Sequence, residues 1–164
     1  MSQALAPRPA NRSETVMTQL VLPQHINAYG TAFGGQMLAW VDVAAGACAM
    51  RHADRVAVTV SFDEVHFKLP VRHGDIVTIT ARVTWAGRTS MEIRVRAERE
   101  SIGEPRELAL EAFTSFVAMG DDGKPAPVPP LLLEDADDRA CFEAALARRE
   151  LRLARAGKRP PSAG

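Results

Sequence analysis

The sequence lacks most of the features that would point to an extracellular, membrane-bound or nucleic-acid-binding protein. Only two of its 164 residues are cysteine, and Cys48 and Cys141 look like free thiols of a reducing compartment rather than a disulfide framework. Its 20 basic and 20 acidic residues cancel, so no overall charge favours nucleic acid or an anionic membrane. No segment approaches the ~18 consecutive apolar residues of a membrane span, and the first residues show no secretory signal. We therefore expect a cytoplasmic protein with no nucleic-acid and no membrane partner.

Motifs of several cofactor-dependent and serine-dependent enzymes are also absent. The chain contains no Gly-x-Ser-x-Gly elbow, no phosphate-binding loop and no dinucleotide-binding glycine motif. Its four histidines have neither the helical spacing of metal ligands nor a neighbouring cysteine pair. We expect no metal and no cofactor.

What the chain does contain is a long apolar segment with a single charge. Between Gly34 and Met50 the only charged residue is Asp42, and apolar residues cover every side of the helical wheel. We expect a helix from about residue 34 to 52 that is buried all round. An ionised carboxylate in such surroundings is costly unless it is paired or used, which makes Asp42 the first candidate for chemistry. Backbone donors or a buried arginine would satisfy the same carboxylate equally well.

Segments with the period-two alternation of β-strands surround this helix. One strand is expected before it, at residues 15–22, and four after it, at about residues 56–62, 77–85, 91–97 and 108–119. Charged residues alternate with apolar ones in segment 91–97, which indicates one dry and one solvent-exposed face. A last helix is expected at about residues 134–156, with acidic residues in its first turn and arginines in its last turns. The elements predict an α+β fold in which an antiparallel sheet of about five strands wraps around one central helix.

The chain is expected to divide into three parts. Residues 1–13, rich in alanine, proline and polar residues, are predicted to be a flexible N-terminal arm. Residues 14–130 form the domain that contains the sheet and the central helix. Residues 131–164 contain the C-terminal helix and a basic tail.

The region around the start of the central helix carries a specific pattern of small and polar residues. Residues 25–36 read His-Ile-Asn-Ala-Tyr-Gly-Thr-Ala-Phe-Gly-Gly-Gln, and residues 40–46 read Trp-Val-Asp-Val-Ala-Ala-Gly. This pattern resembles that of the hotdog-fold acyl-CoA thioesterases, especially the bacterial acyl-CoA hydrolases and the related animal cytosolic and brown-fat enzymes, and the similarity covers residues 15–119. The resemblance implies a hotdog thioesterase domain over residues 14–130 that hydrolyses acyl-CoA to a carboxylic acid and CoA. It also implies a homodimer that often assembles into a hexamer, a trimer of dimers.

The resemblance further implies that Asn27 and Asp42 form the functional pair. Asp42 would act as a general base on water or attack the thioester as a nucleophile. The amides of Gly34 and Gly35 at a helix start, with Asn27, would polarise the thioester carbonyl, although asparagine in such a loop also commonly forms an Asx turn. At ~1.5 Å per residue, Asp42 lies roughly 11–12 Å along the helix from Gly34. We therefore expect the carboxylate of one subunit to face the amides and the asparagine of its dimer partner.

The CoA moiety requires cations, hydroxyls and amides for its phosphates. Arg88, Thr89 and Ser90 at a hairpin tip offer these groups, and Phe67 and Lys68 at a strand end are further candidates for substrate contacts. For each single cation the alternative is an ordinary solvated surface charge.

Two other functions remain open for the same fold. A hotdog enoyl-CoA hydratase or dehydratase would act on the same acyl chains, but it usually relies on a histidine in the central helix, and none precedes Arg51 there. A non-catalytic acyl-CoA-binding regulator could keep the fold and the basic contacts without needing Asp42.

Overall fold

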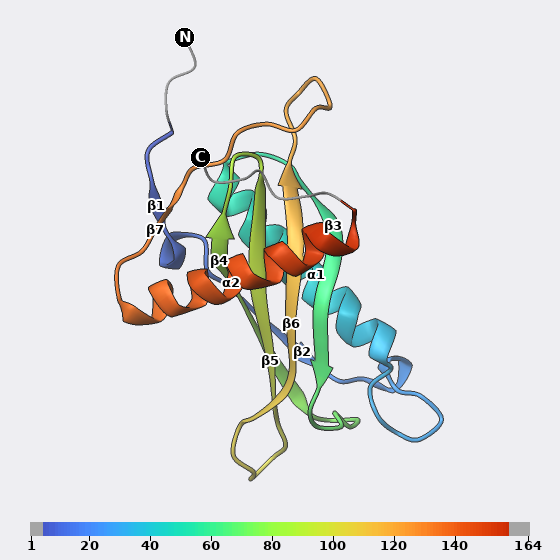
Figure 1. The fold of residues 1–164 in the computed structure, drawn as a ribbon. Coiled ribbons are helices and arrows are strands. Elements are labelled where there is room, and N and C mark those ends of the chain that lie inside the picture. The colour runs from blue at the N-terminus through green and yellow to red at the C-terminus, as the bar shows by residue number, and fades with distance from the viewer. Residues whose placement is uncertain (1–4, 158–164) are drawn as a thin grey trace.

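One antiparallel sheet and two long helices organise the chain (Figure 1). The computed structural model describes residues 5–157. The elements in chain order are β1 (Arg8–Pro9), η1 (Ala10–Arg12), β2 (Thr15–Leu20), η2 (Pro23–His25), α1 (Gly34–Ala53), β3 (Ala57–Phe67), β4 (Ile76–Ala86), β5 (Ser90–Glu100), β6 (Glu107–Ala118), β7 (Leu131–Leu132) and α2 (Ala136–Arg155). The five-stranded sheet has the order β2-β4-β5-β6-β3, with α1 packed on its inner face and α2 crossing its outer face. This arrangement confirms the predicted hotdog fold.

Helix α1 supplies one side of the hydrophobic core, but it is not buried all round. Its buried side chains include Trp40, Val41 and Cys48, which pack against the inner face of the sheet. The prediction of complete burial is wrong for the single chain, because Val43 is 61% exposed and Met50 is 43% exposed. The sheet covers only part of the circumference of α1, and the remaining apolar side chains face outwards.

Strand β3 forms one edge of the sheet and has two exposed valines, of which Val60 lines a surface cavity together with Arg149 and Arg152 of α2. It pairs with β6 on one side only and continues to Phe67, beyond the predicted end. Val58 is 43% and Val60 is 60% exposed. We refer to these two valines of the edge strand and the exposed Val43 and Met50 of α1 as the α1–β3 surface. An unpaired edge strand with exposed apolar side chains is a template for pairing with another chain.

Helix α2 covers the sheet face that the sequence indicated to be solvent-exposed. Its N-cap is Asp135, whose carboxylate accepts a hydrogen bond from the Asp138 amide at 2.8 Å. Glu92, expected on the exposed face of its strand, is fully buried, and the Arg148 guanidinium donates to its carboxylate at 2.7 Å. The expectation is therefore wrong at Glu92, because arginines of α2 replace solvent as its partners.

Part of the segment predicted as an N-terminal arm contacts the main domain. Strand β1 pairs in parallel with β7, and the Arg8 guanidinium donates to the carbonyl oxygen of His52 at 2.6 Å and pairs with Asp54. Residues 1–4 of the arm and residues 158–164 of the basic tail lie outside the described residues. Neither helix of the described chain combines the length and apolarity needed to cross a membrane.

Candidate active site

The loop before α1 fixes the orientation of the Asn27 side chain. The chain turns tightly here, with the Gly30 amide donating to the Asn27 carbonyl oxygen at 3.0 Å and Gly30 in the left-handed region at φ 76°. Asn27 Oδ1 accepts from the Tyr29 amide at 2.9 Å and from the Thr31 amide at 3.3 Å. Because both partners are donors, Oδ1 is assigned as the oxygen, and within residues 5–157 Nδ2 has no hydrogen-bond partner. The Asx turn is therefore present and leaves the amide donor available.

The first turn of α1 presents backbone amides that no side chain caps. Phe33 is the N-cap and makes no side-chain cap hydrogen bond. The Gln36 amide already bonds to the Phe33 carbonyl oxygen at 2.9 Å, whereas the Gly34 and Gly35 amides have no acceptor among the described residues. A Cβ atom at Gly35 would lie 2.5 Å from the Phe33 ring, so the glycine permits this close approach. Such free amides at a helix start suit a developing negative charge.

Asp42 lies two turns further along α1 and has one polar side-chain partner among the residues that the structure describes. Its Oδ1 accepts a hydrogen bond from Thr59 Oγ1 of β3 at 2.7 Å. No salt bridge to Asp42 occurs among residues 5–157, so it is not held in a closed ion pair. The carboxylate is half-buried next to the exposed Val43. Sequence reasoning missed Thr59, because the strand pattern alone does not show which face of β3 meets Asp42.

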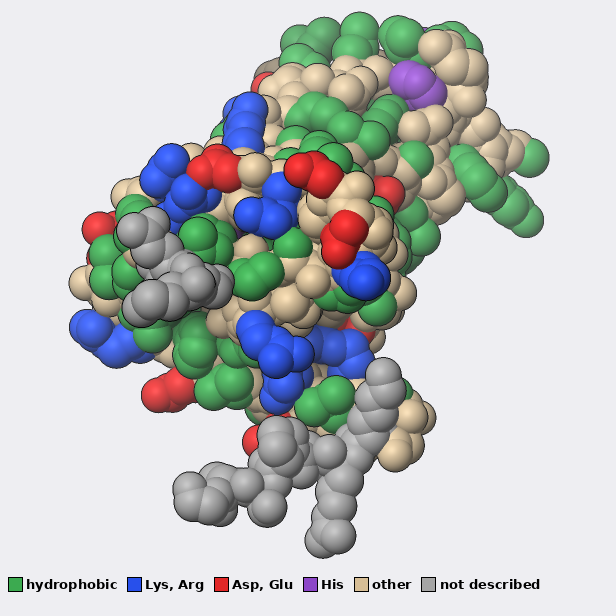
Figure 2. Space-filling model, turned by 90° about the horizontal axis from the view of Figure 1, so that it is seen from above, with side chains coloured by type: hydrophobic (Ala, Val, Ile, Leu, Met, Phe, Trp, Pro, Cys, Tyr) green, Lys and Arg blue, Asp and Glu red, His purple; other side chains and the backbone are tan. Residues whose placement is uncertain are grey.

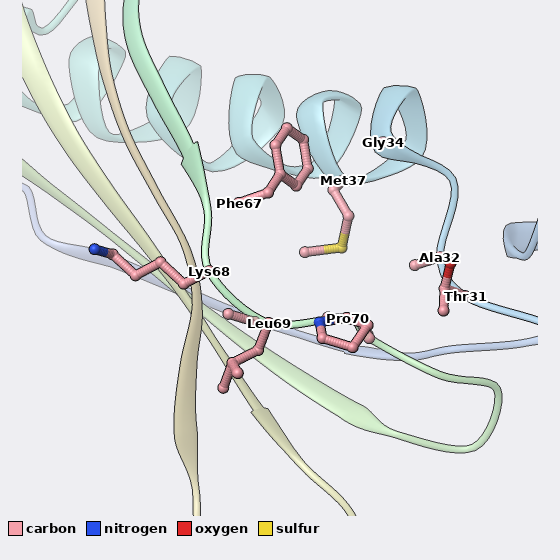
Figure 3. Close-up of a pocket in the computed structure, with 10 residues that line it drawn as sticks. Thr31, Ala32, Gly34, Met37, Phe67, Lys68, Leu69 and Pro70 are labelled. Atoms are coloured by element: carbon pink, nitrogen blue, oxygen red, sulfur yellow. The ribbon is translucent and has the colours of Figure 1, made fainter.

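A cavity of about 410 Å³ opens at the N-terminal end of α1 (Figure 3). Its lining consists of Thr31, Ala32, Gly34, Met37, Phe67, Lys68, Leu69, Pro70, Val71 and Ala109. Met37 and Phe67 extend into the space between α1 and the end of β3, while the Lys68 side chain points away from the helix (Figure 3). Gly34 and Phe67 thus line the same cavity, but Asp42 does not line it.

The remaining candidates for CoA binding lie at the other end of the sheet. Ser90 pairs with Val117 of β6, whereas Phe67 pairs with Leu110. These two positions of β6 are about 24 Å apart at the rise of an antiparallel strand. A single chain therefore does not bring Ser90 and its hairpin neighbours next to Phe67 and Lys68.

Backbone hydrogen bonds hold the hairpin tip that carries Arg88, Thr89 and Ser90 against neighbouring segments. The Arg88 carbonyl oxygen accepts from the Val128 amide and the Thr89 carbonyl oxygen accepts from the Ala118 amide, both at 2.9 Å. The Arg88 side chain is exposed. Seen from that end of the molecule, Lys and Arg side chains gather near the C-terminal helix (Figure 2).

Two other potentially reactive features do not contribute to this site. Burial raises the pKa of the Cys48 thiol to about 12, so the thiol remains protonated near neutral pH and is a poor nucleophile. Within residues 5–157, no three histidine, cysteine or acidic side chains are grouped so that they could hold a metal ion.

Comparison with known proteins identifies relatives of this chain among the thioesterases. The profile of the Thioesterase superfamily matches residues 29–105. The uncharacterized acyl-CoA thioester hydrolase YkhA of Bacillus subtilis is 38% identical over 138 residues, which span 83% of this chain and 80% of YkhA. The cytosolic acyl coenzyme A thioester hydrolase of Rattus norvegicus is 33% identical, and there the match spans only 37% of the longer relative.

Solved structures of acyl-CoA thioesterases share the fold of this chain. An apo-hexameric acyl-CoA thioesterase has a TM-score of 0.89 and 40% identity, with 93% of this chain and 98% of that chain covered. The acyl-CoA hydrolase of Staphylococcus aureus, solved with butyryl coenzyme A and coenzyme A, has a TM-score of 0.85 and 36% identity over 90% and 91% of the two chains. Variants of that hydrolase with alanine in place of an asparagine, an aspartate or a threonine have also been solved.

Fold and site together define a hotdog-fold thioester hydrolase. The chain belongs to the thioesterase superfamily and, within it, to the acyl-CoA thioester hydrolases. It is an enzyme that hydrolyses acyl-CoA thioesters.

Proposed function

We propose that the hydrolysis takes place at a site shared by two protomers. Asp42 of one protomer, oriented by Thr59, activates water or attacks the thioester carbon. The free amides at the start of α1 and the Asn27 Nδ2 of the second protomer hold the oxyanion that develops on the carbonyl. The observation that carries this proposal is the separation within one chain, since Asp42 contacts Thr59 of β3 and does not line the cavity beside Gly34.

The α1–β3 surface supports association of two copies. If two β3 edges pair antiparallel around a two-fold axis, their sheets become continuous and the exposed valines of both copies are covered. This pairing places the Phe67 end of one β3 next to the Ala57 end of the other. Ala57 pairs with Ala118 of β6, whose amide bonds to Thr89. The two groups of CoA candidates, separated in one chain, would then meet across the interface.

The comparisons support the same assembly and the same residues. The similar apo-hexameric acyl-CoA thioesterase leads us to propose that dimers of this chain assemble into a hexamer. In the Staphylococcus aureus hydrolase, the substituted asparagine, aspartate and threonine occur in the same order and with the same separations as Asn27, Asp42 and Thr59.

The proposed chemistry requires only side chains, backbone amides and water. The thioester carbonyl receives hydrogen bonds as its oxygen becomes negative, and the tetrahedral intermediate expels the CoA thiolate. With Asp42 as base, the carboxylate removes a proton from the attacking water. With Asp42 as nucleophile, an acyl anhydride forms first and water then cleaves it.

Thiol release from acetyl-, butyryl- and palmitoyl-CoA tests the proposed role of Asp42. We expect the wild type to release thiol and Asp42→Ala to lower kcat by about 10²-fold or more, in the range of general-base catalysis. Binding without release would identify a regulator, and addition of water to an enoyl-CoA would identify a hydratase. Either result would contradict the proposal.

Mixing two inactive variants tests whether the site is shared. If it is shared, a dimer of one Asp42→Ala and one Asn27→Ala chain contains one intact site. Random mixing in equal amounts after dissociation should then restore about a quarter of the wild-type activity, because half the dimers are mixed and each has one working site of two. A site within one chain would give no recovery. The control is each variant dissociated and reassembled alone.

A further inference from the structure

The edge strand that carries Thr59 is irregular where it passes Asp42. The register of β3 against β6 shifts between Thr59 and Ser61 and again between Phe62 and Glu64. In a regular strand, Thr59 and Ser61 would lie on the same face. A bulge inserts one residue, and the side chains that follow it change face. This is observed here, since Thr59 contacts Asp42 on the inner face while Ser61 points to the outer face.

A single carboxylate on the outer face holds the irregular segment. Asp63 accepts hydrogen bonds from Ser61 and Ser115, each at 2.7 Å, and its side chain is only 10% exposed. The Arg152 guanidinium of α2 donates to the same carboxylate at 2.5 Å. Asp63 therefore ties three segments together, namely its own strand, β6 and the C-terminal helix.

The helix side of this contact is itself anchored. Arg152 lies 3.9 Å from the buried carboxylate of Glu92, which also pairs with Arg148 at 2.7 Å. Thr84 donates to Glu92 at 2.8 Å. The position of Arg152 above β3 is thus fixed by two carboxylates, of which Glu92 is fully buried and Asp63 is 10% exposed.

We propose that Asp63 and Arg152 are positioning residues for the thioesterase reaction. They hold the bulged segment of β3 in the one conformation that turns Thr59 towards Asp42 and Ser61 away from it. Helix α2, on the outer face of the sheet, thereby controls the direction of the Asp42 carboxylate on the inner face. This inference rests on the proposed role of Asp42 and assigns a catalytic consequence to the docking of α2.

The first test compares kcat and KM for acyl-CoA in Asp63→Asn and Arg152→Gln with the wild type. We expect kcat to fall by about tenfold with little change in KM, because misplacement of a catalytic group by a fraction of an ångström lowers the chemical step. The matched control is Glu64→Gln, which neutralises the adjacent carboxylate of the same strand without breaking a contact to α2. It should keep the wild-type kcat.

A double-mutant comparison separates positioning from general loss of stability. In a Thr59→Val background the hydroxyl is absent, so adding Asp63→Asn should lower kcat by less than twofold further. The Asp63→Asn and Arg152→Gln changes combined should lower kcat little more than either alone, because both remove the same Asp63–Arg152 ion pair. A crystal structure of Asp63→Asn should show Thr59 Oγ1 more than about 3.5 Å from Asp42, beyond hydrogen-bond distance.

Several outcomes would overturn the inference. An unchanged kcat in Asp63→Asn, or an equal loss of kcat with and without the Thr59 hydroxyl, would show that Asp63 does not act through Thr59. A wild-type chain that releases no thiol from any acyl-CoA would instead refute the proposed function, and this inference with it. Circular dichroism identifies a variant that loses activity because it unfolds. If Asp63→Asn unfolds, kcat of Arg152→Gln tests the same ion pair from the side of α2.

Discussion

The two ends of the Asn27 amide have separate roles. The oxygen closes the turn before α1 through two backbone amides, and the nitrogen keeps its donors free for the proposed oxyanion contact. The turn therefore orients the donor, and the two interpretations of this residue are compatible. Thr59 has a comparable role, since its hydroxyl donates to one oxygen of Asp42, while the other oxygen has no hydrogen-bond partner among residues 5–157.

His52, in the last turn of α1, shows how burial changes the protonation of a side chain. It is fully buried, with Nε2 3.1 Å from the Pro129 carbonyl oxygen and Nδ1 without a partner among the described residues. Burial lowers its pKa most, the Pro129 contact opposes this with a smaller effect, and the charges of Arg8 and Arg12 lower the pKa by still smaller amounts. The folded chain therefore holds His52 neutral at a pH where the unfolded chain is already protonated.

This difference predicts an acid-dependent loss of stability. As the pH falls below about 6.5, the unfolded chain binds a proton that the folded chain does not, so the free energy of unfolding decreases by up to about 1.4 kcal/mol per pH unit. The loss stops below the lowered folded pKa. The His52→Gln variant should show a smaller decrease between pH 7.5 and 5 in chemical denaturation. His66→Gln, at an exposed strand position, should keep the wild-type dependence, and the same dependence in both variants would contradict the assignment.

At the scale of elements, the C-terminal helix is held by charges under its middle rather than by a broad apolar face. Glu92 is fully buried between β5 and α2, and Arg148 also stacks on the Phe113 ring at 3.7 Å. A buried ion pair adds little net stability compared with apolar residues, but removal of one partner leaves a costly unpaired charge. The pair therefore specifies where α2 docks.

Replacing Arg148 alone should lower the free energy of unfolding more than replacing both Arg148 and Glu92. We expect Arg148→Met to lower the free energy of unfolding by about 3 kcal/mol, since it leaves the Glu92 carboxylate buried without its counterion. The double variant Glu92→Gln with Arg148→Met should be less destabilised than Arg148→Met alone. Arg155→Met, an exposed arginine of the same helix, should change stability by less than about 0.5 kcal/mol. Urea denaturation measures all three, and equal losses for Arg148 and Arg155 would refute the role of the pair.

At the level of the whole molecule, a single chain leaves an apolar surface exposed and contains only part of the proposed active site. The α1–β3 surface exposes four apolar side chains beside an unpaired strand edge. The proposed oxyanion donors and the carboxylate lie at different places along α1. Association through this surface would complete both, which links activity to assembly.

A charge on the exposed edge of β3 should therefore abolish association and activity together. We expect Val60→Lys to give a monomer in multi-angle light scattering and to lower acyl-CoA hydrolysis by about 10²-fold, because like charges would meet across the two-fold axis. Val16→Lys is the matched control, since Val16 is also 60% exposed but lies on β2 at the opposite edge. It should leave the dimer and its activity intact. A fully active Val60→Lys monomer would show that one chain contains the whole site.

The order and type of the main elements and the prominence of Asp42 could be predicted from the sequence, because they follow from local periodicity and from the cost of one charge in an apolar helix. The hotdog class came from the resemblance of residues 25–46 to a known family. Only the tertiary structure showed that β3 is an edge strand, that its bulges turn Thr59 towards Asp42 and that α2 buries Glu92. Those features depend on which strand pairs with which and on contacts between residues far apart in the chain, and no local pattern encodes them.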